Sequence, residues 1–322
     1  NFWYRTVGDC YLYIGNSYYD SDAYEDALRS FDQAIKIYTA NNAYQKLADT
    51  HKSIGAVFYL LKDSQKALEN YKKAYDLYQN KVSKEHPECA SISNEIAKVY
   101  ANQKSLDEAF QYYKTALDIN ITKFGKEHPD VARGYNCIAD IFYAKGMSED
   151  ALEYYKLAAN IFRKKIFRDY PYATRNFRSV ADTLSEVGSY DTAIQYYQKL
   201  LKMKIPKVGQ KDPEVGMIFK RMAHAYFKKG RYDQAVIYYE RALKAIEKEL
   251  GSDHPEVIEA YDNLKLARMN NQDFEFIINN YNKALAILRE KYGENHIEVA
   301  TVYNSIGLNC NLNAMYDKAL EY

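Results

Sequence analysis

A single alanine register constrains this chain of 322 residues more than any other feature. The alanines recur at intervals of 40, 42, 42, 42, 42 and 84 residues, at Ala27, Ala67, Ala109, Ala151, Ala193, Ala235 and Ala319. The last interval spans a further unit, with Ile277 in the alanine position. An aromatic residue follows each of the first seven register positions after four residues: Phe31, Tyr71, Tyr113, Tyr155, Tyr197, Tyr239 and Tyr281. A fixed period of this size predicts stacked repeats, each of which contacts mainly its neighbours.

Residues 129–167 show what one unit contains. Pro129 suits the first turn of a helix, where its missing N–H would be unpaired in any case. Helical spacing then joins the apolar face Tyr135, Ile138, Ala139 and Phe142. Gly146 predicts the end of this helix, and a second helix carries Ala151, Tyr155 and Ala158 on one face. We therefore predict an all-α fold in which each unit is a pair of antiparallel helices, A and B. The small alanines let the two helices cross closely.

This pattern resembles the tetratricopeptide repeat. The period of 42 exceeds the 34 residues common in that family, and helix B is correspondingly longer. The joint between units reads Gly-x-x-His-Pro at 125–129 and 251–255. Both features are similar to the kinesin light chain type of repeat. The resemblance implies a right-handed superhelical α-solenoid of about 7.5 repeats, with helix A lining an inner groove and helix B lying outside.

One solenoid is expected across residues 1–322. Its predicted units lie near 8–47, 48–89, 90–131, 132–173, 174–215, 216–257, 258–299 and 300–322, the last of them cut short. Because an outermost repeat needs a polar cap for solubility, and Phe2, Trp3 and Tyr4 are apolar, we expect the natural chain to continue at both ends.

Composition narrows the function classes. The net charge is +1 and the isoelectric point is about 7.7, so no global field favours nucleic acid or an acidic membrane. No stretch of about 18 apolar residues is present to span a bilayer. The four cysteines are widely spaced, which favours a reducing compartment. We expect a cytoplasmic protein, with a cytoskeletal or ciliary location as a further hypothesis from composition.

The sequence gives no support for catalysis. It contains no nucleophile elbow, phosphate-binding glycine loop or zinc-ligand spacing, so we predict no enzyme activity, no cofactor and no metal. Four histidines occupy one position just before helix A, at His86, His128, His254 and His296. Their repetition indicates a role in capping or turn formation. His51 replaces an aromatic residue on a helix A face and is predicted to belong to the core, whereas His224 is predicted to face solvent.

Helical geometry and the resemblance together identify the residues that face the groove, since residues four apart share a helix face. The candidates for binding a peptide or partner helix are Asn94, Lys98, Asn136, Asp140, Arg178, Asp182, Lys220, His224 and Asn304. The asparagines both donate and accept hydrogen bonds, as a peptide backbone does. Either these polar residues contact a partner, or they are solvated and satisfy one another's charge between repeats.

Two further features remain open. Tyr112, Tyr154, Tyr196 and Tyr238 recur once per repeat and either pack against a neighbouring helix or form a convex aromatic stripe for a large partner. The seventh unit departs from the pattern, with Lys265 at a small-residue position, Arg268 at an aromatic position and Ile277 in the alanine register. That unit is either a degenerate repeat carried by its neighbours or a repeat whose altered angle opens a partner site.

The leading interpretation is a non-enzymatic scaffold that binds peptide segments or partner helices in its groove. A second is an architectural subunit of a large cytoskeletal or ciliary assembly, for which the many Tyr, Asn and Lys residues are the compositional argument. A third is a sensor or adaptor arm of a larger protein with a catalytic or signalling domain elsewhere. All three require protein partners, and none requires nucleic acid or a membrane.

Overall fold

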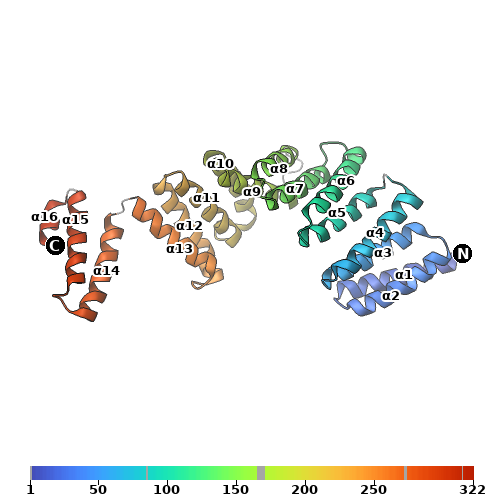
Figure 1. The fold of residues 1–322 in the computed structure, drawn as a ribbon, viewed down its shortest axis with the longest axis horizontal. Coiled ribbons are helices and arrows are strands. Elements are labelled where there is room, and N and C mark those ends of the chain that lie inside the picture. Colours follow the sequence, from blue (N-terminus) through green and yellow to red (C-terminus); the bar gives the residue numbers. More distant parts are fainter. Residues whose placement is uncertain (1, 85, 165–170, 272–273, 314) are drawn as a thin grey trace. The chain divides into compact units, whose positions relative to one another are not determined.

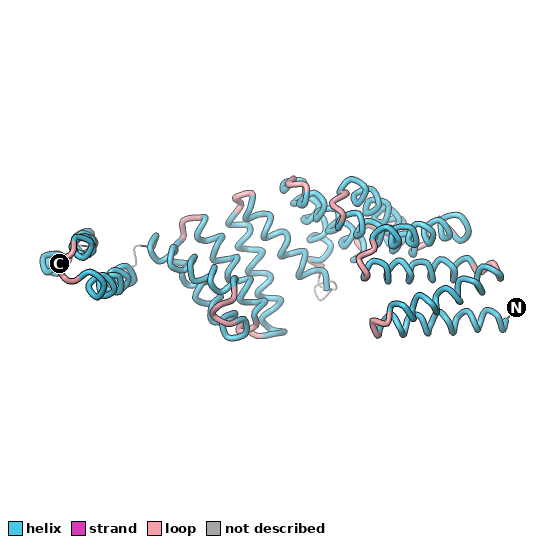
Figure 2. Tube along the Cα trace, turned by 60° about the horizontal axis from the view of Figure 1, so that its bottom comes forward, coloured by secondary structure: helices cyan, strands magenta, loops and turns pink. Residues whose placement is uncertain are grey.

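The computed structural model describes residues 2–84, 86–164, 171–271, 274–313 and 315–322. Every regular element in these ranges is a helix, and the helices are joined by short loops (Figures 1 and 2). The all-α prediction is confirmed for the part of the chain that is described. The chain divides into two compact units, residues 1–183 and 184–322.

The first unit is a succession of helix pairs. Its elements are α1 (Phe2–Asp20), α2 (Tyr24–Ala40), α3 (Tyr44–Leu60), α4 (Ser64–Leu77) with a short π-helical continuation (Tyr78–Val82), α5 (Pro87–Asn102), α6 (Leu106–Phe124), α7 (Pro129–Ala144), α8 (Ser148–Phe162) and most of α9 (Pro171–Glu186). Each odd-numbered helix up to α7 packs against the even-numbered helix that follows it. The odd-numbered helices therefore correspond to helix A.

The second unit continues the alternation from the end of α9. It contains α10 (Tyr190–Val208), α11 (Pro213–Lys228), α12 (Tyr232–Leu250), α13 (Pro255–Asn270), α14 (Phe274–Tyr292), α15 (Ile297–Leu312) and α16 (Tyr316–Glu321). Its main core joins α11, α12 and α13, around Tyr239, Ile246 and Val257.

The alanine register forms the closest crossing of each helix pair. The six alanines from Ala27 to Ala235 have no exposed surface, and the aromatic residues that follow them are buried. The small position on helix A meets the same aromatic ring: a Cβ added to Gly55 would lie 2.7 Å from the ring of Tyr71. Because even the Cβ of an alanine at Gly55 would displace the ring, this pair packs as it does only with glycine there, and other repeats carry at most an alanine at the same position, such as Ala97 and Ala139.

The recurring histidines cap helix A, as predicted. The Nδ1 atom of His86 accepts a hydrogen bond from the Glu88 backbone N–H at 3.2 Å, and His128, His254 and His296 make the equivalent bond. Asp212 does the same through Oδ1 at 2.8 Å. Each cap satisfies one of the amide groups that a helix N-terminus leaves unpaired. These histidines are therefore structural.

The seventh repeat packs differently from the others. Ile277, Tyr281 and Ala284 hold three register positions whose residues are almost fully buried in repeats one to six. In the seventh repeat these three residues are only half-buried. Lys265, at the small position of α13, is exposed. A long charged side chain at this position prevents the close crossing, so α13 and α14 share few contacts. Whether a partner uses this opening stays a prediction.

Candidate functional site

The first unit contains a pocket of about 320 Å³ on the face formed by its odd-numbered helices. Helices α5, α7 and α9 supply most of the lining, and α6 contributes one tyrosine. The lining residues are Ser91, Asn94, Glu95, Lys98, Tyr113, Arg133, Asn136, Cys137, Asp140, Tyr172 and Arg175. Polar side chains therefore converge here from three successive A helices, which are held in place by the packed alanine crossings behind them.

Two asparagine side chains in this pocket each have one buried atom without a hydrogen-bond partner. Asn136, on α7, is only 6% exposed, and its Nδ2 is buried without an acceptor. Asn94 occupies the same position one repeat earlier, on α5, and its Oδ1 is buried without a donor. A buried polar group that makes no hydrogen bond costs about 1–3 kcal/mol. The pocket wall thus holds one donor and one acceptor without partners, and both atoms have almost no exposed surface.

Asn136 is tied to a second buried asparagine. Asn176, on α9, has no exposed surface, and its Nδ2 donates to Asn136 Oδ1 at 2.7 Å and to the Tyr155 backbone oxygen at 3.0 Å. The Asn136 oxygen is consequently occupied, which leaves its NH₂ group as the free part of the side chain.

Asp140, an acidic side chain of α7 in the pocket lining, bonds to residues of the two following helices. Asp140 accepts a hydrogen bond from Tyr155 Oη at 2.5 Å and pairs with Arg175 Nη2 at 2.7 Å. Burial raises the pKa of the Asp140 carboxyl above its ordinary value of 3.8, while the Tyr155 hydrogen bond and the Arg175 charge act in the opposite direction. Asp140 therefore orients a tyrosine and an arginine in the resting site.

The other basic groups of the pocket also have acidic partners. Lys98 Nζ lies 2.7 Å from Glu95 Oε1, and Arg133 Nη2 lies 3.3 Å from Asp130 Oδ1. The Arg133 guanidinium also lies over the Tyr172 ring, 5.7 Å from its centroid. Each base of the pocket thus has its own acid, so the site carries little uncompensated charge.

The lone thiol of the pocket is unreactive in this setting. Burial raises the pKa of the Cys137 thiol to about 11, with a further contribution from the Asp140 charge. Because the thiolate is the nucleophilic form, Cys137 is a neutral wall residue near neutral pH.

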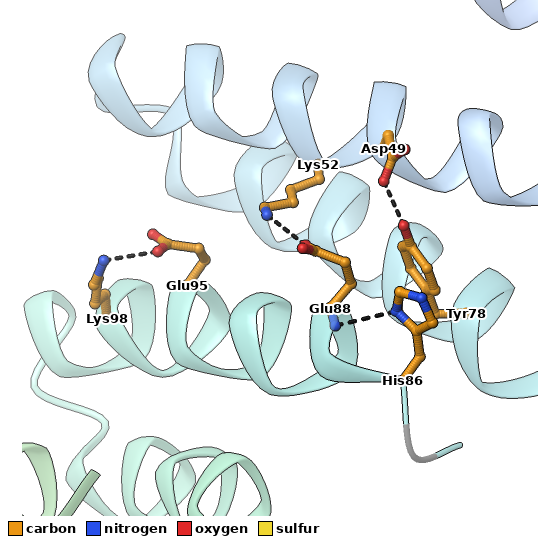
Figure 3. A network of polar contacts seen from close by, with 7 residues as sticks. All are labelled: Asp49, Lys52, Tyr78, His86, Glu88, Glu95 and Lys98. Carbon is orange, nitrogen blue, oxygen red and sulfur yellow. Dashed lines mark hydrogen bonds and ion pairs between the residues drawn. The ribbon is translucent and has the colours of Figure 1, made fainter. Parts of the chain in front are cut away.

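A neighbouring groove position is closed by an ion pair. Lys52, on α3, occupies the register position of Asn94 and Asn136, and its Nζ lies 2.6 Å from Glu88 Oε2 on the next A helix (Figure 3). Asp49 accepts a hydrogen bond from Tyr78 on the same face (Figure 3). A second pocket of about 310 Å³ includes Asp49, Lys52 and Glu88 in its lining. Polar groups there are already paired with one another.

The second unit repeats this arrangement. Lys220, on α11, is 9% exposed and pairs with Glu256 and Glu259 on α13, the latter at 2.7 Å. The acid follows the lysine by 36 residues in both units. A lysine at this register position therefore binds the next A helix, whereas an asparagine leaves the position open. At Lys220 the groove satisfies its own charge, which was one of the two interpretations of the sequence.

The structure brings only some of the sequence-predicted residues together. Asn94, Lys98, Asn136 and Asp140 all line the 320 Å³ pocket. Arg178 is exposed on α9, and Asp182 is half-buried on the same helix. In the second unit, His224 on α11 and Asn304 on α15 are both exposed. Partial desolvation of the His224 ring lowers its pKa below the ordinary 6.5.

Other pocket residues were missed because only two rows of the helix A face were considered. Ser91, Arg133 and Arg175 lie three residues before the asparagine register, so they share its face one turn earlier. That spacing was available in the sequence. The register aromatics also reach this site: Tyr113 lines the pocket, and the Tyr155 hydroxyl bonds to Asp140.

Three of the four repeated tyrosines stack on an aromatic residue of helix A in their own repeat. The rings of Tyr112 and Tyr100 stack with centroids 5.7 Å apart, Tyr154 and Phe142 at 5.3 Å, and Tyr238 and Tyr226 at 5.4 Å. Lys199 Nζ lies 4.7 Å from the ring centroid of Tyr196. All four tyrosines stay half-buried, and their use by a partner remains a prediction.

No group of three or more His, Cys, Asp or Glu residues in the described ranges is arranged to hold a metal ion. Nor does any described helix combine the length and the apolar character needed to cross a membrane.

Comparison with known proteins agrees with the repeat architecture. The tetratricopeptide repeat family matches residues 8–80, 88–164, 130–205, 214–268 and 261–322. No curated protein matches the chain. Among solved structures, BtubC (BKLC) from P. vanneervenii is similar at 22% identity with a TM-score of 0.61, over 72% of this chain and 92% of that one.

Two other solved structures show the same fold. A putative kinesin light chain with nearly identical TPR-like repeats from Podosopora anserina is 17% identical with a TM-score of 0.55, over 62% of this chain and 95% of that one. The pilF protein of Pseudomonas aeruginosa is 19% identical with a TM-score of 0.55, over 80% of this chain and 98% of that one. At these identities the similarity concerns the fold.

Proposed function

Because this chain belongs to the tetratricopeptide repeat family, whose members are generally protein-interaction scaffolds, we propose that it binds an extended segment of a partner protein in the 320 Å³ pocket of its first unit. Members of the family are typically non-catalytic, and the pocket's acids and bases are bonded to one another. Its role is therefore recognition.

The free donor and acceptor on consecutive A helices carry this proposal. An extended backbone presents carbonyl and N–H groups along one edge, which matches the Asn136 NH₂ and the Asn94 oxygen. Adjacent helices lie roughly 8–10 Å apart and an extended residue advances about 3.3 Å. A segment of about six residues is therefore long enough to cross α5, α7 and α9.

The pocket's charge pattern favours a segment recognised mainly through its backbone. Lys98, Arg133 and Arg175 each have an acid of this chain within 3.3 Å, so a strongly acidic segment would have to compete with those acids. The Tyr113 and Tyr172 rings add apolar surface for one side chain of the segment. The architectural role and the sensor-arm role stay predictions from the sequence.

A selection experiment tests the proposal. Random dodecapeptides would be displayed and selected on the purified chain, and the affinity of the strongest binder measured by calorimetry. We expect Asn136→Ala to weaken binding about tenfold, the effect of about 1.4 kcal/mol from one lost buried hydrogen bond. Asn120→Ala serves as the matched control, since Asn120 is a buried amide of α6 outside the pocket lining.

The outcomes divide clearly. Weaker binding in Asn136→Ala and in Asn94→Ala, with the control unchanged, supports the pocket as the binding site. Selected peptides that bind all of these variants equally well would show that the partner surface lies elsewhere on the chain.

A further inference from the structure

Asn176 is the only amide at its position in the repeat. The equivalent residues in other repeats are Cys10, Thr50, Ile92, Gly134, Ile218, Ala260 and Val302. Asn176 is nevertheless fully buried, and its Oδ1 has no hydrogen-bond partner in the described structure. A buried acceptor without a donor destabilises the fold, so packing alone does not explain an asparagine where two other repeats carry isoleucine.

A backbone carbonyl determines the orientation of the Asn176 amide and, through it, the orientation of the Asn136 amide. The Tyr155 carbonyl oxygen can only accept, so Asn176 must turn its NH₂ toward it. The second hydrogen of the same NH₂ then meets Asn136, which must present Oδ1. Reversing either amide would place two donors or two acceptors against each other.

We infer that Asn176 is a positioning residue, which holds the Asn136 side chain with its NH₂ toward the pocket, so that α7 presents a donor there. This inference rests on the proposed function and specifies it further. The ligand atom that meets Asn136 is an acceptor such as a backbone carbonyl, and the group that meets Asn94 is a donor such as a backbone N–H. The site is therefore selective for one polarity of hydrogen-bonding groups along the segment.

The orientation can be measured without a ligand. In the full chain with ¹⁵N-labelled asparagine, hydrogen exchange of the side-chain NH₂ groups reports which of them are bonded. We expect the Asn176 NH₂ to exchange slowly and the Asn136 NH₂ at least tenfold faster, because only the former has acceptors. A protected Asn136 NH₂ beside an exchanging Asn176 NH₂ would overturn the inference.

A substitution taken from two other repeats separates positioning from stability. Asn176→Ile introduces the residue found at 92 and 218, so the variant is expected to fold. In it, Asn136 is free to rotate, and the affinity for the selected dodecapeptide should fall at least threefold while the melting temperature is maintained. Thr50→Ile is the matched control, because Thr50 is equally buried at the same position of another repeat and bonds only its own helix.

A double-mutant cycle completes the test. If Asn176 acts through Asn136, then Asn136→Ala should weaken binding about tenfold in the wild-type background and at most about twofold in the Asn176→Ile background. Equal effects in both backgrounds would reduce Asn176 to a packing residue. If no selected peptide depends on Asn136, the proposed function fails, while the exchange measurement still decides the orientation of the amide.

Discussion

At the scale of single residues, the turn between helices A and B contains one position whose backbone is strained unless it is glycine. Gly146, Gly188 and Gly230 occupy this turn with φ near +80°, whereas Lys62 and Lys104 occupy it with φ of 65° and 62°. A side chain with a Cβ is disfavoured in this left-handed region by roughly 1–2 kcal/mol. The lysines are thus tolerated because the packed helices on either side impose the turn.

The first prediction concerns this turn. Lys104→Gly should raise the free energy of unfolding by about 0.5–1 kcal/mol, since glycine relieves the strain and loses some of the gain to its greater freedom when unfolded. Gly146→Ala, the converse change one repeat later, should lower it by about 1 kcal/mol. Urea denaturation of both variants gives the values, and changes of the same sign in both would contradict the account.

The second prediction concerns pH. His51 Nδ1 lies 3.0 Å from Asn70 Oδ1, and burial lowers the pKa of His51 from its ordinary 6.5, with a further lowering by Lys73. The folded state thus prefers neutral His51, and stability is lost as the pH falls below about 6.5 toward the folded-state pKa. His51→Gln should flatten this part of the curve of unfolding free energy against pH. An unchanged curve between pH 7.5 and 5 would refute the assignment.

Individual residues also show where sequence reasoning succeeds and where it stops. Repetition alone was enough to predict the histidine caps, and the asparagine register located Asn94 and Asn136. Asn176 could not be predicted as functional because its role depends on which backbone carbonyl and which amide lie beside it after folding. Such contacts join residues 21 and 40 positions apart and leave no periodic signal.

At the scale of helices, the alanine register and the small residue of helix A decide how closely a pair packs. The sequence therefore predicted the pairs and their order well. It also indicated the irregular seventh repeat, where Lys265 and Ile277 replace two small residues and the pair of α13 and α14 stays open. The sequence pattern could not predict how much stability this open pair loses, because that loss depends on how far α13 and α14 separate.

The third prediction restores this repeat. Lys265→Ala together with Ile277→Ala gives α13 and α14 the small residues of the other crossings, so the pair should close and bury Tyr281. We expect slower backbone hydrogen exchange in α13 and α14 and about 1–2 kcal/mol of added stability. Lys283→Ala, on an exposed part of α14, controls for the loss of charge. Unchanged exchange in the double variant would indicate that other residues keep the pair apart.

At the scale of the whole chain, the net charge is close to zero, and many basic side chains lie beside acidic ones. The net charge is +1, and each base of the first unit's pocket has an acid of this chain beside it. The lysines at the asparagine register position, Lys52 and Lys220, are likewise paired with the next A helix. In each unit, therefore, the described lysines at this position are neutralised by acids of the chain itself, and our proposal concerns the asparagines.

The fourth prediction follows from this pairing. Because paired charges leave the pocket with little net field to attract a peptide, the affinity for the selected dodecapeptide should change less than about threefold between 50 and 500 mM salt. Titration calorimetry across this range supplies the test. A loss of two orders of magnitude would show that the site attracts its partner mainly through net charge.

The most direct measurement of the central claim is a crystal structure of the chain bound to the selected dodecapeptide. The account predicts an extended peptide across α5, α7 and α9, with a backbone carbonyl oxygen within about 3.2 Å of Asn136 Nδ2 and a backbone N–H donating to Asn94 Oδ1. A peptide bound to the even-numbered helices, or bound in the pocket with both amides still unpaired, would contradict it.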